Sequence, residues 1–183
     1  MRTRVVLAAI AVLVTTVVAG VAPASAATPP ARDPFYKAPR GLGSARPGAV
    51  LRWRQVDVKI GGPSLGGSAT AYQLLYRTND AKNHALANVT TVIVPTMASP
   101  PGARQLVSVQ DAENAADSRC APSYQLQQGE MGEDNVNNGN LAAEMTGLGV
   151  RQLAAGRVLV VPDPEGPRHM YTARAMEIGR AHV

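Results

Sequence analysis

Hydrophobic and polar residues alternate along the first half of the chain in the pattern of β-strands. In LRWRQVDVKI, residues 51–60, the alternation holds except for one slip at Gln55, which we interpret as a β-bulge. ATAYQLLYRT (69–78) and NVTTVIVP (88–95) predict two further strands, and the polar residues 79–87 predict a hairpin loop between them. This half therefore predicts strands that pair in antiparallel fashion.

The second half predicts a strand, a helix and another strand. RQLVSVQ (104–110) is a short apolar run, and RVLVVPD (157–163) is a continuous apolar run, as in parallel strands buried on both faces. Between them Asn140 can cap a helix that Gly156 ends. The order of these elements predicts an α/β sheet with an antiparallel edge. The apolar side chains expected on one face of the helix are Leu141, Met145, Leu148 and Leu153.

Both ends of the chain are expected to lie outside the main domain, residues 50–177. Residues 1–26 have a basic start, an apolar run too short to span a bilayer and a small-residue cleavage site, the pattern of a secretory signal peptide. Residues 27–49 predict an extended arm that lies against the body, since Phe35 and Tyr36 would otherwise be exposed apolar surface. IGRAHV (178–183) can be read as ATC GGA AGA GCA CAC GTC, one frame of a widely used sequencing adapter, and we expect a non-native tail there.

Composition argues against several kinds of partner. Without the arginines of the expected signal and tail, Arg2, Arg4 and Arg180, 15 basic residues stand against 13 acidic ones, and they are scattered. We therefore expect no nucleic-acid partner. No cysteine lies near the expected cleavage site, so we expect no stable membrane anchor. The spacing of His84 and the other two histidines does not suit metal ligands, and we expect neither metal nor other cofactor.

Residues 62–66, GPSLG, match the G-x-S-x-G pattern that marks the nucleophile of many esterases and lipases. A nucleophile elbow turns from a buried strand directly into a helix, but Ser64 is followed by more glycine and then by a strand pattern. Pro63 also removes a backbone N–H from the turn. We therefore interpret Ser64 as a turn residue that is dispensable for chemistry.

Six stretches of the chain resemble, in order, the secretory lipase family, which comprises exported α/β-hydrolases and includes the lipase-A-like triacylglycerol lipases. The resemblance implies the N-terminal, incomplete portion of an α/β-hydrolase fold. It also implies hydrolysis of lipid (triacylglycerol) or short-chain carboxylic esters by a triad of Ser, an acidic residue and His. The matching stretches are DPFY (33–36), AYQLLYRTND (71–80), VTTVIVP (89–95), LVSVQ (106–110), CAPSY (120–124) and VVPDPEGP (160–167).

The resemblance also implies roles for single positions. The family's triad residues follow a later strand than residues 157–163, so none would lie in this chain, which we expect to be an inactive fragment. One oxyanion-hole donor would be a backbone N–H after residues 106–110, at Asn114, where Asp is more typical of the family. Cys120 would form a disulfide with a cysteine further along the chain. Arg157 and Pro164 stand where aromatic residues are typical.

Two other interpretations stay open. The chain could be an exported non-catalytic binding module with the Pro-rich arm as a tether. It could also be a complete but degenerate hydrolase, which a single cysteine in an exported protein disfavours. A downstream strand, G-x-S-x-G and helix would decide for the enzyme. The sequence predicts no particular oligomeric state.

Overall fold

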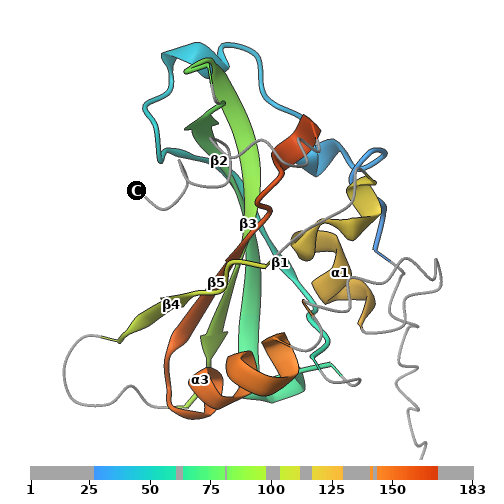
Figure 1. The fold of residues 1–183 in the computed structure, drawn as a ribbon, viewed down its shortest axis with the longest axis vertical. Coiled ribbons are helices and arrows are strands. Elements are labelled where there is room, and N and C mark those ends of the chain that lie inside the picture. Colours follow the sequence, from blue (N-terminus) through green and yellow to red (C-terminus); the bar gives the residue numbers. More distant parts are fainter. Residues whose placement is uncertain are drawn as a thin grey trace, which may run out of the picture.

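The centre of the protein is one five-stranded sheet with the strand order β1-β2-β3-β5-β4 (Figure 1). The strands are β1 (Val50–Val56), β2 (Ala69–Asn79), β3 (Ala85–Pro95), β4 (Leu106–Ser108) and β5 (Val158–Pro162). A computed structural model describes residues 27–60, 64–80, 82–97, 104–111, 117–129, 141 and 144–168.

The sheet is mixed, as the order of elements predicts. β1, β2 and β3 form an antiparallel meander, β5 runs antiparallel to β3, and β4 runs parallel to β5. The predicted bulge at Gln55 is wrong, because Gln55 pairs regularly with Tyr72. The register instead shifts between Val50 and Arg52, where the edge strand begins. The chain leaves β1 after Val56 and turns into the core.

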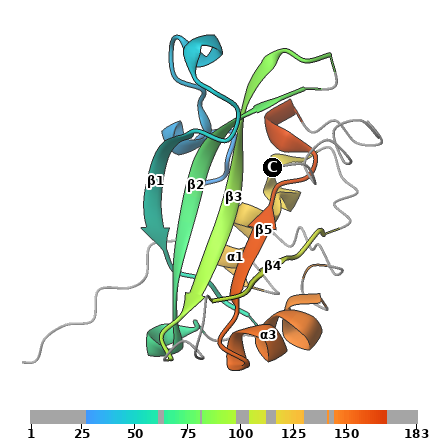
Figure 2. The same cartoon turned by 90° about the vertical axis from the view of Figure 1, so that its left-hand side faces the viewer.

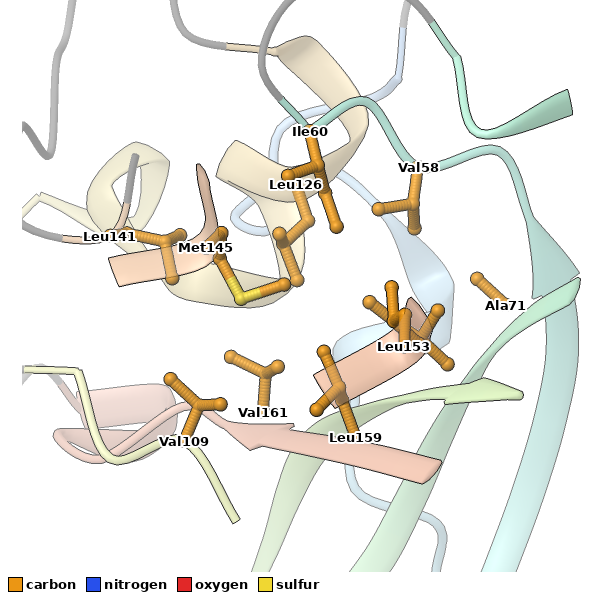
Figure 3. Packing of buried hydrophobic residues seen from close by; sticks show 11 residues of the cluster. Val58, Ile60, Ala71, Val109, Leu126, Leu141, Met145, Leu153, Leu159 and Val161 are labelled. Carbon is orange, nitrogen blue, oxygen red and sulfur yellow. The ribbon is translucent and has the colours of Figure 1, made fainter. Parts of the chain in front are cut away.

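Helices α1 (Pro122–Gln128) and α3 (Val150–Ala154) pack on one face of the sheet, and α1 lies behind the strands in Figure 2. Paired residues of neighbouring strands share a face, and on this face Ile93 pairs with Leu159. Figure 3 shows how Leu126 of α1 and Met145 and Leu153 from the α3 region meet the side chains of β5. The buried apolar residues of this cluster are Val58, Ile60, Ala71, Ile93, Val109, Leu126, Leu141, Met145, Leu153, Leu159 and Val161.

A wide turn, Met145–Gly149, precedes α3, and because of it the predicted apolar face of the helix is wrong at Leu148. The N–H of Val150 bonds to the carbonyl of Met145, five residues back, as in a π-helix. The extra residue in this turn rotates Leu148 to the surface, where it is 49% exposed. Gly149 faces the core instead, and a Cβ there would come within 3.1 Å of Met145 Cε and 3.4 Å of Leu159 Cδ1. The predicted stop is confirmed, because Gly156 has a φ of 76° and follows the end of α3.

The opposite face of the sheet is only partly covered. Trp53, which pairs with Leu74 on this face, is 64% exposed and meets Tyr72 edge-on at 5.9 Å between ring centroids. Val160 of β5 points to the same side and is half-buried. The prediction that residues 157–163 are buried on both faces is therefore wrong for the described structure. Val160 is only half-buried because α1 and α3 both pack on the other face of the sheet.

The N-terminal arm lies against the sheet. Phe35, in the short turn η1 (Pro34–Tyr36), is buried in a second cluster with Leu75, Ala87 and Val89. The guanidinium of Arg54 stacks 4.2 Å from the centre of the Phe35 ring. It also forms an ion pair with Asp33 at 2.7 Å. These contacts hold the arm to β1 and agree with the expectation that Phe35 and Tyr36 are covered.

Candidate functional site

Ser64, the serine of the G-x-S-x-G match, lies at the surface between two strands. Its Oγ donates a hydrogen bond to Asp57 Oδ1 and accepts one from the Gly66 N–H at 3.2 Å. Ser64 bridges to Lys59, and the chain then passes through the short turn η3 (Gly66–Ser68) into β2. A strand follows this turn where a nucleophile elbow needs a helix. The geometry agrees with the interpretation of Ser64 as a turn residue.

The histidines do not form a catalytic or metal-binding cluster in the part of the chain that the structure describes. His84 lies in the β2–β3 hairpin, and its side chain is 69% exposed. Its Nδ1 lies 3.2 Å from Asp80 Oδ2, and Asp80 also accepts hydrogen bonds from the N–H groups of Lys82 and His84. His169 and His182 lie outside the described residues. Within the described ranges no three His, Cys, Asp or Glu residues are placed to hold a metal ion.

The expected oxyanion-hole residue, Asn114, also lies outside the described residues. The segments before and after it are described. Asp111, which follows β4, is buried, and Cys120 is buried at the end of the short turn η4 (Ser118–Cys120) that leads into α1. The connection therefore starts beside a buried residue, Asp111, and leads through the half-buried Asp117 and Ser118 to the buried Cys120.

The main polar site of the described structure joins α1 to the end of β5. Ser123, in the first turn of α1, is fully buried. Its N–H donates to Asp163 Oδ1 at 2.8 Å, and its Oγ donates to Asp163 Oδ2 at 2.7 Å. Asp163 immediately follows β5 and is 4% exposed. A buried carboxylate needs such donors to offset the loss of hydration.

Tyr36 and Gln73 extend this site toward the N-terminal arm. The Tyr36 hydroxyl lies 2.9 Å from Ser123 Oγ, and since Ser123 Oγ donates to Asp163, the tyrosine is the donor here. Gln73 Nε2 donates to the Ser123 carbonyl at 2.7 Å. Burial, and then the charge of Asp163, raise the pKa of Tyr36 above its usual range, so the phenol stays protonated.

Asp163 is itself held to β3. Its N–H donates to the Val89 carbonyl at 3.0 Å, and its carbonyl accepts from Asn88 Nδ2 at 2.9 Å. Beside these residues lies a cavity of about 700 Å³, whose lining includes Tyr36, Asn88, Asp163, Leu75, Val89 and Ala121. The cavity therefore lies at the carboxyl end of β5, the end at which α/β sheets bind ligands.

Tyr36, Ser123 and Asp163 can hold structure but are not arranged for nucleophilic attack. Ser123 Oγ is buried, and its proton goes to a carboxylate, whereas an activated serine needs an accessible Oγ and a base that can take its proton. The sequence pattern does not predict a site at Tyr36, Ser123 and Asp163. One feature of the sequence could have pointed to them: each lies in one of the six stretches that resemble the lipase family, DPFY, CAPSY and VVPDPEGP.

The fold is that of part of an α/β-hydrolase, as the likeness to two solved structures shows. The structure of Candida antarctica lipase A in its closed state is similar with a TM-score of 0.72 and 31% sequence identity, over 83% of this chain and 34% of that chain. A second structure of the same lipase has a TM-score of 0.71 over 85% of this chain. No family model matches the sequence.

Curated relatives indicate which kind of α/β-hydrolase the chain resembles. The chain is 39% identical over 142 residues to a protein of Mycobacterium tuberculosis named as a probable inactive lipase. It is 38% identical over 146 residues to Lipase 9 of Candida albicans and 35% identical over 149 residues to a secreted triacylglycerol lipase of Malassezia furfur. These matches cover 78%, 79% and 81% of this chain, which spans 30% of the length of each relative. Over about four fifths of its length the chain therefore resembles the lipase-A-like secretory lipases, and it corresponds to a part of them.

Proposed function

We propose that the protein is a secreted lipase or carboxylesterase of which this chain is the N-terminal part. The observation that carries the proposal is the likeness to Candida antarctica lipase A, which combines a TM-score of 0.72 with 31% identity over 83% of the chain. Substrates would be lipids such as triacylglycerol, or short-chain esters. The Ser, acidic residue and His would lie in sequence outside the matched part, which spans 30% of each of these relatives.

This chain would contribute an oxyanion-hole donor to that site and one cysteine of a disulfide. The connection from Asp111 to Ser118 leaves the carboxyl end of β4, which runs parallel to β5. In α/β-hydrolases a backbone N–H of the loop at this position is one of the oxyanion donors. We assign it to the region of Asn114. Cys120, the single cysteine of the chain, would pair with a cysteine of the remaining sequence.

Secretion is part of the proposal. It rests on the signal-like pattern of residues 1–26, with the mature chain starting at Ala27, and on a Malassezia furfur relative that is named a secreted lipase. Of the described residues, none belongs to a helix that is long and apolar enough to cross a membrane.

A non-catalytic role is the second candidate. The observation that favours it is that a relative with 39% identity is named a probable inactive lipase. A protein of this kind would keep the sheet and the cavity beside Asp163 but would lack a working triad. It would act as an exported binding module.

The test is to read the genomic locus, express the full open reading frame and measure hydrolysis of p-nitrophenyl esters together with labelling by a fluorophosphonate. We expect turnover, and a label on a serine in a G-x-S-x-G that follows the described part. The 27–183 segment is the matched control, and we expect it to be inactive and poorly soluble. A folded full-length protein without turnover or label would decide for the binding module. Robust turnover by the 27–183 segment would contradict the proposed position of the triad.

A further inference from the structure

We infer that Asn88 is a glycosylation site of the unfolded chain only, and that a glycan on Asn88 and the native fold exclude each other. Asn88, Val89 and Thr90 form the sequence Asn-X-Thr, the acceptor for N-linked glycosylation. Independent of the ester site, this exclusion applies wherever the chain enters a secretory pathway that glycosylates its cargo.

An Asn-X-Thr sequence usually marks a surface loop of a secreted protein, because the attached glycan is bulky and needs water around it. Here the sequence lies within β3, which has β2 on one side and β5 on the other. Asn88 pairs with Tyr76 of β2 and is 2% exposed. Thr90 pairs with Pro162 of β5 and is also buried. The folded chain therefore presents no acceptor nitrogen at Asn88 to a transferase.

The side-chain nitrogen of Asn88 also has two hydrogen-bond partners in the fold. Nδ2 donates to the Asp163 carbonyl at 2.9 Å and to the Tyr76 hydroxyl at 3.3 Å. The first bond joins β3 to the residue that follows β5, and the Asp163 N–H donates in turn to the Val89 carbonyl at 3.0 Å. Asn88 thus extends the contact between β3 and β5 beyond the end of β5.

Glycosylation would replace one of the two Nδ2 hydrogens. In the transfer, the bond from the sugar C1 to a lipid-linked diphosphate breaks, a C1–N bond to Asn88 forms, and Nδ2 loses one proton while the diphosphate leaves with its lipid. Because a C–N bond is about 1.5 Å long, a C1 that points at the Asp163 oxygen, 2.9 Å from Nδ2, would lie about 1.4 Å from it and clash. Rotation of the amide toward the neighbouring cavity would instead move Nδ2 away from both acceptors.

The order of synthesis exposes Asn88 before its partner exists. Asp163 lies 75 residues further along the chain. At about 5–20 residues per second, translation reaches Asp163 about 4–15 s after Asn88. During this interval β3 has no β5 beside it, so the acceptor amide is accessible. A glycan added then would block the later contact between β3 and the end of β5.

The experiment expresses the full-length reading frame from Ala27 behind a yeast secretion leader, and peptide mass spectrometry measures the glycan occupancy of Asn88. We expect glycan on Asn88 in the retained, insoluble fraction and none in secreted protein. Thr90→Val removes the acceptor sequence and keeps Asn88. Since Thr90 Oγ1 is buried without a hydrogen-bond partner among the described residues, the fold should tolerate this change. We expect the secreted yield of Thr90→Val to exceed that of the parent about threefold or more.

Export to the periplasm of a bacterium without the transferase is the matched control, and there the two proteins should give soluble yields within about twofold. A gain for Thr90→Val of the same size in both hosts would trace the effect to Thr90 itself and overturn the inference. Glycan on Asn88 in secreted protein, or secreted yields in yeast that are measurable and equal, would also overturn it.

Cell-free translation with microsomes gives a second measurement that does not require secretion. Modified and unmodified parent chains differ in size, and Thr90→Val identifies the band that carries glycan on Asn88. After the membranes are dissolved in detergent, we expect a protease to digest the modified chains at least about tenfold faster, because they stay unfolded. Equal protease resistance of the two forms, or no glycan on Asn88 in either system, would overturn the inference.

Discussion

Ser64 and Ser123 each donate a hydrogen bond to an aspartate, but they occupy opposite kinds of environment. Ser64 and Asp57 are both exposed and lie seven residues apart in a surface turn. Ser123 and Asp163 are both buried and join segments 40 residues apart. Only Ser64 carries the sequence pattern of a nucleophile, and only Ser123 belongs to an extended buried network.

Burial and hydrogen-bond partners, rather than a five-residue pattern, decide what a serine can do. An exposed Ser–Asp pair adds little stability, because water competes for both groups. A buried pair has no such competitor, and removal of one member takes a hydrogen-bond partner away from a buried group of the other. The buried pair is therefore expected to govern stability and positioning, and the exposed one to be replaceable. Substitutions at the two pairs test that difference.

Asp163→Ala should be the most damaging change. It leaves the buried Ser123 N–H and Oγ without their acceptor, and we expect the free energy of unfolding to fall by about 3 kcal/mol. The measurement is urea denaturation of the full-length protein followed by circular dichroism. Asp57→Ala is the control, with an expected change below about 0.5 kcal/mol. Equal effects of the two substitutions would abolish the distinction drawn between the two pairs.

Tyr36 should make the stability of the buried network depend on alkaline pH. Because its pKa is raised in the folded protein, the unfolded chain loses the phenolic proton first as pH rises above about 10. The contribution of this group is therefore complete below that pH and declines above it, by at most about 1.4 kcal/mol for each pH unit.

Tyr36→Phe removes the titrating group and is the matched variant. Unfolding free energies of the parent and the variant, measured between pH 8 and 11, should converge as the pH rises, because only the parent loses this contribution. A constant difference across that range would mean that Tyr36 titrates alike in the folded and unfolded states.

The fold could be predicted from the sequence where local pattern and tertiary packing agree. The alternation of residues 69–78 matches β2 closely, because buried and half-buried residues alternate along that strand. Residues 88–95 lie within β3, which begins three residues earlier, at Ala85. The predicted face of the helix failed at Leu148, since a π-type turn adds one residue that periodicity cannot reveal. The burial of Val160 depends on whether another part of the protein covers that face of the sheet, and the sequence of the strand alone does not reveal this.

The polar site could not be derived from the sequence by pattern. Asp163 contacts Ser123 and Asn88, and the network continues to Tyr36 and Gln73, which are distant from it in the chain. These residue types have no periodic or spacing signal, and only the topology of the sheet brings them together. The G-x-S-x-G match, by contrast, is easily visible in the sequence because it is local.

Ser64→Ala should have the smallest effect and completes the comparison. The substitution removes one exposed hydrogen bond to Asp57 and one weak acceptor for the Gly66 N–H. We expect unfolding free energy to change by less than about 0.5 kcal/mol. We also expect p-nitrophenyl ester hydrolysis by the full-length enzyme to stay within a few-fold of the parent, because this serine lies between two strands and has Asp57, rather than a histidine, as its partner. A loss on the order of 10³-fold, with stability retained, is what removal of a true nucleophile produces. That result would make Ser64 the catalytic serine and would contradict the proposed position of the triad.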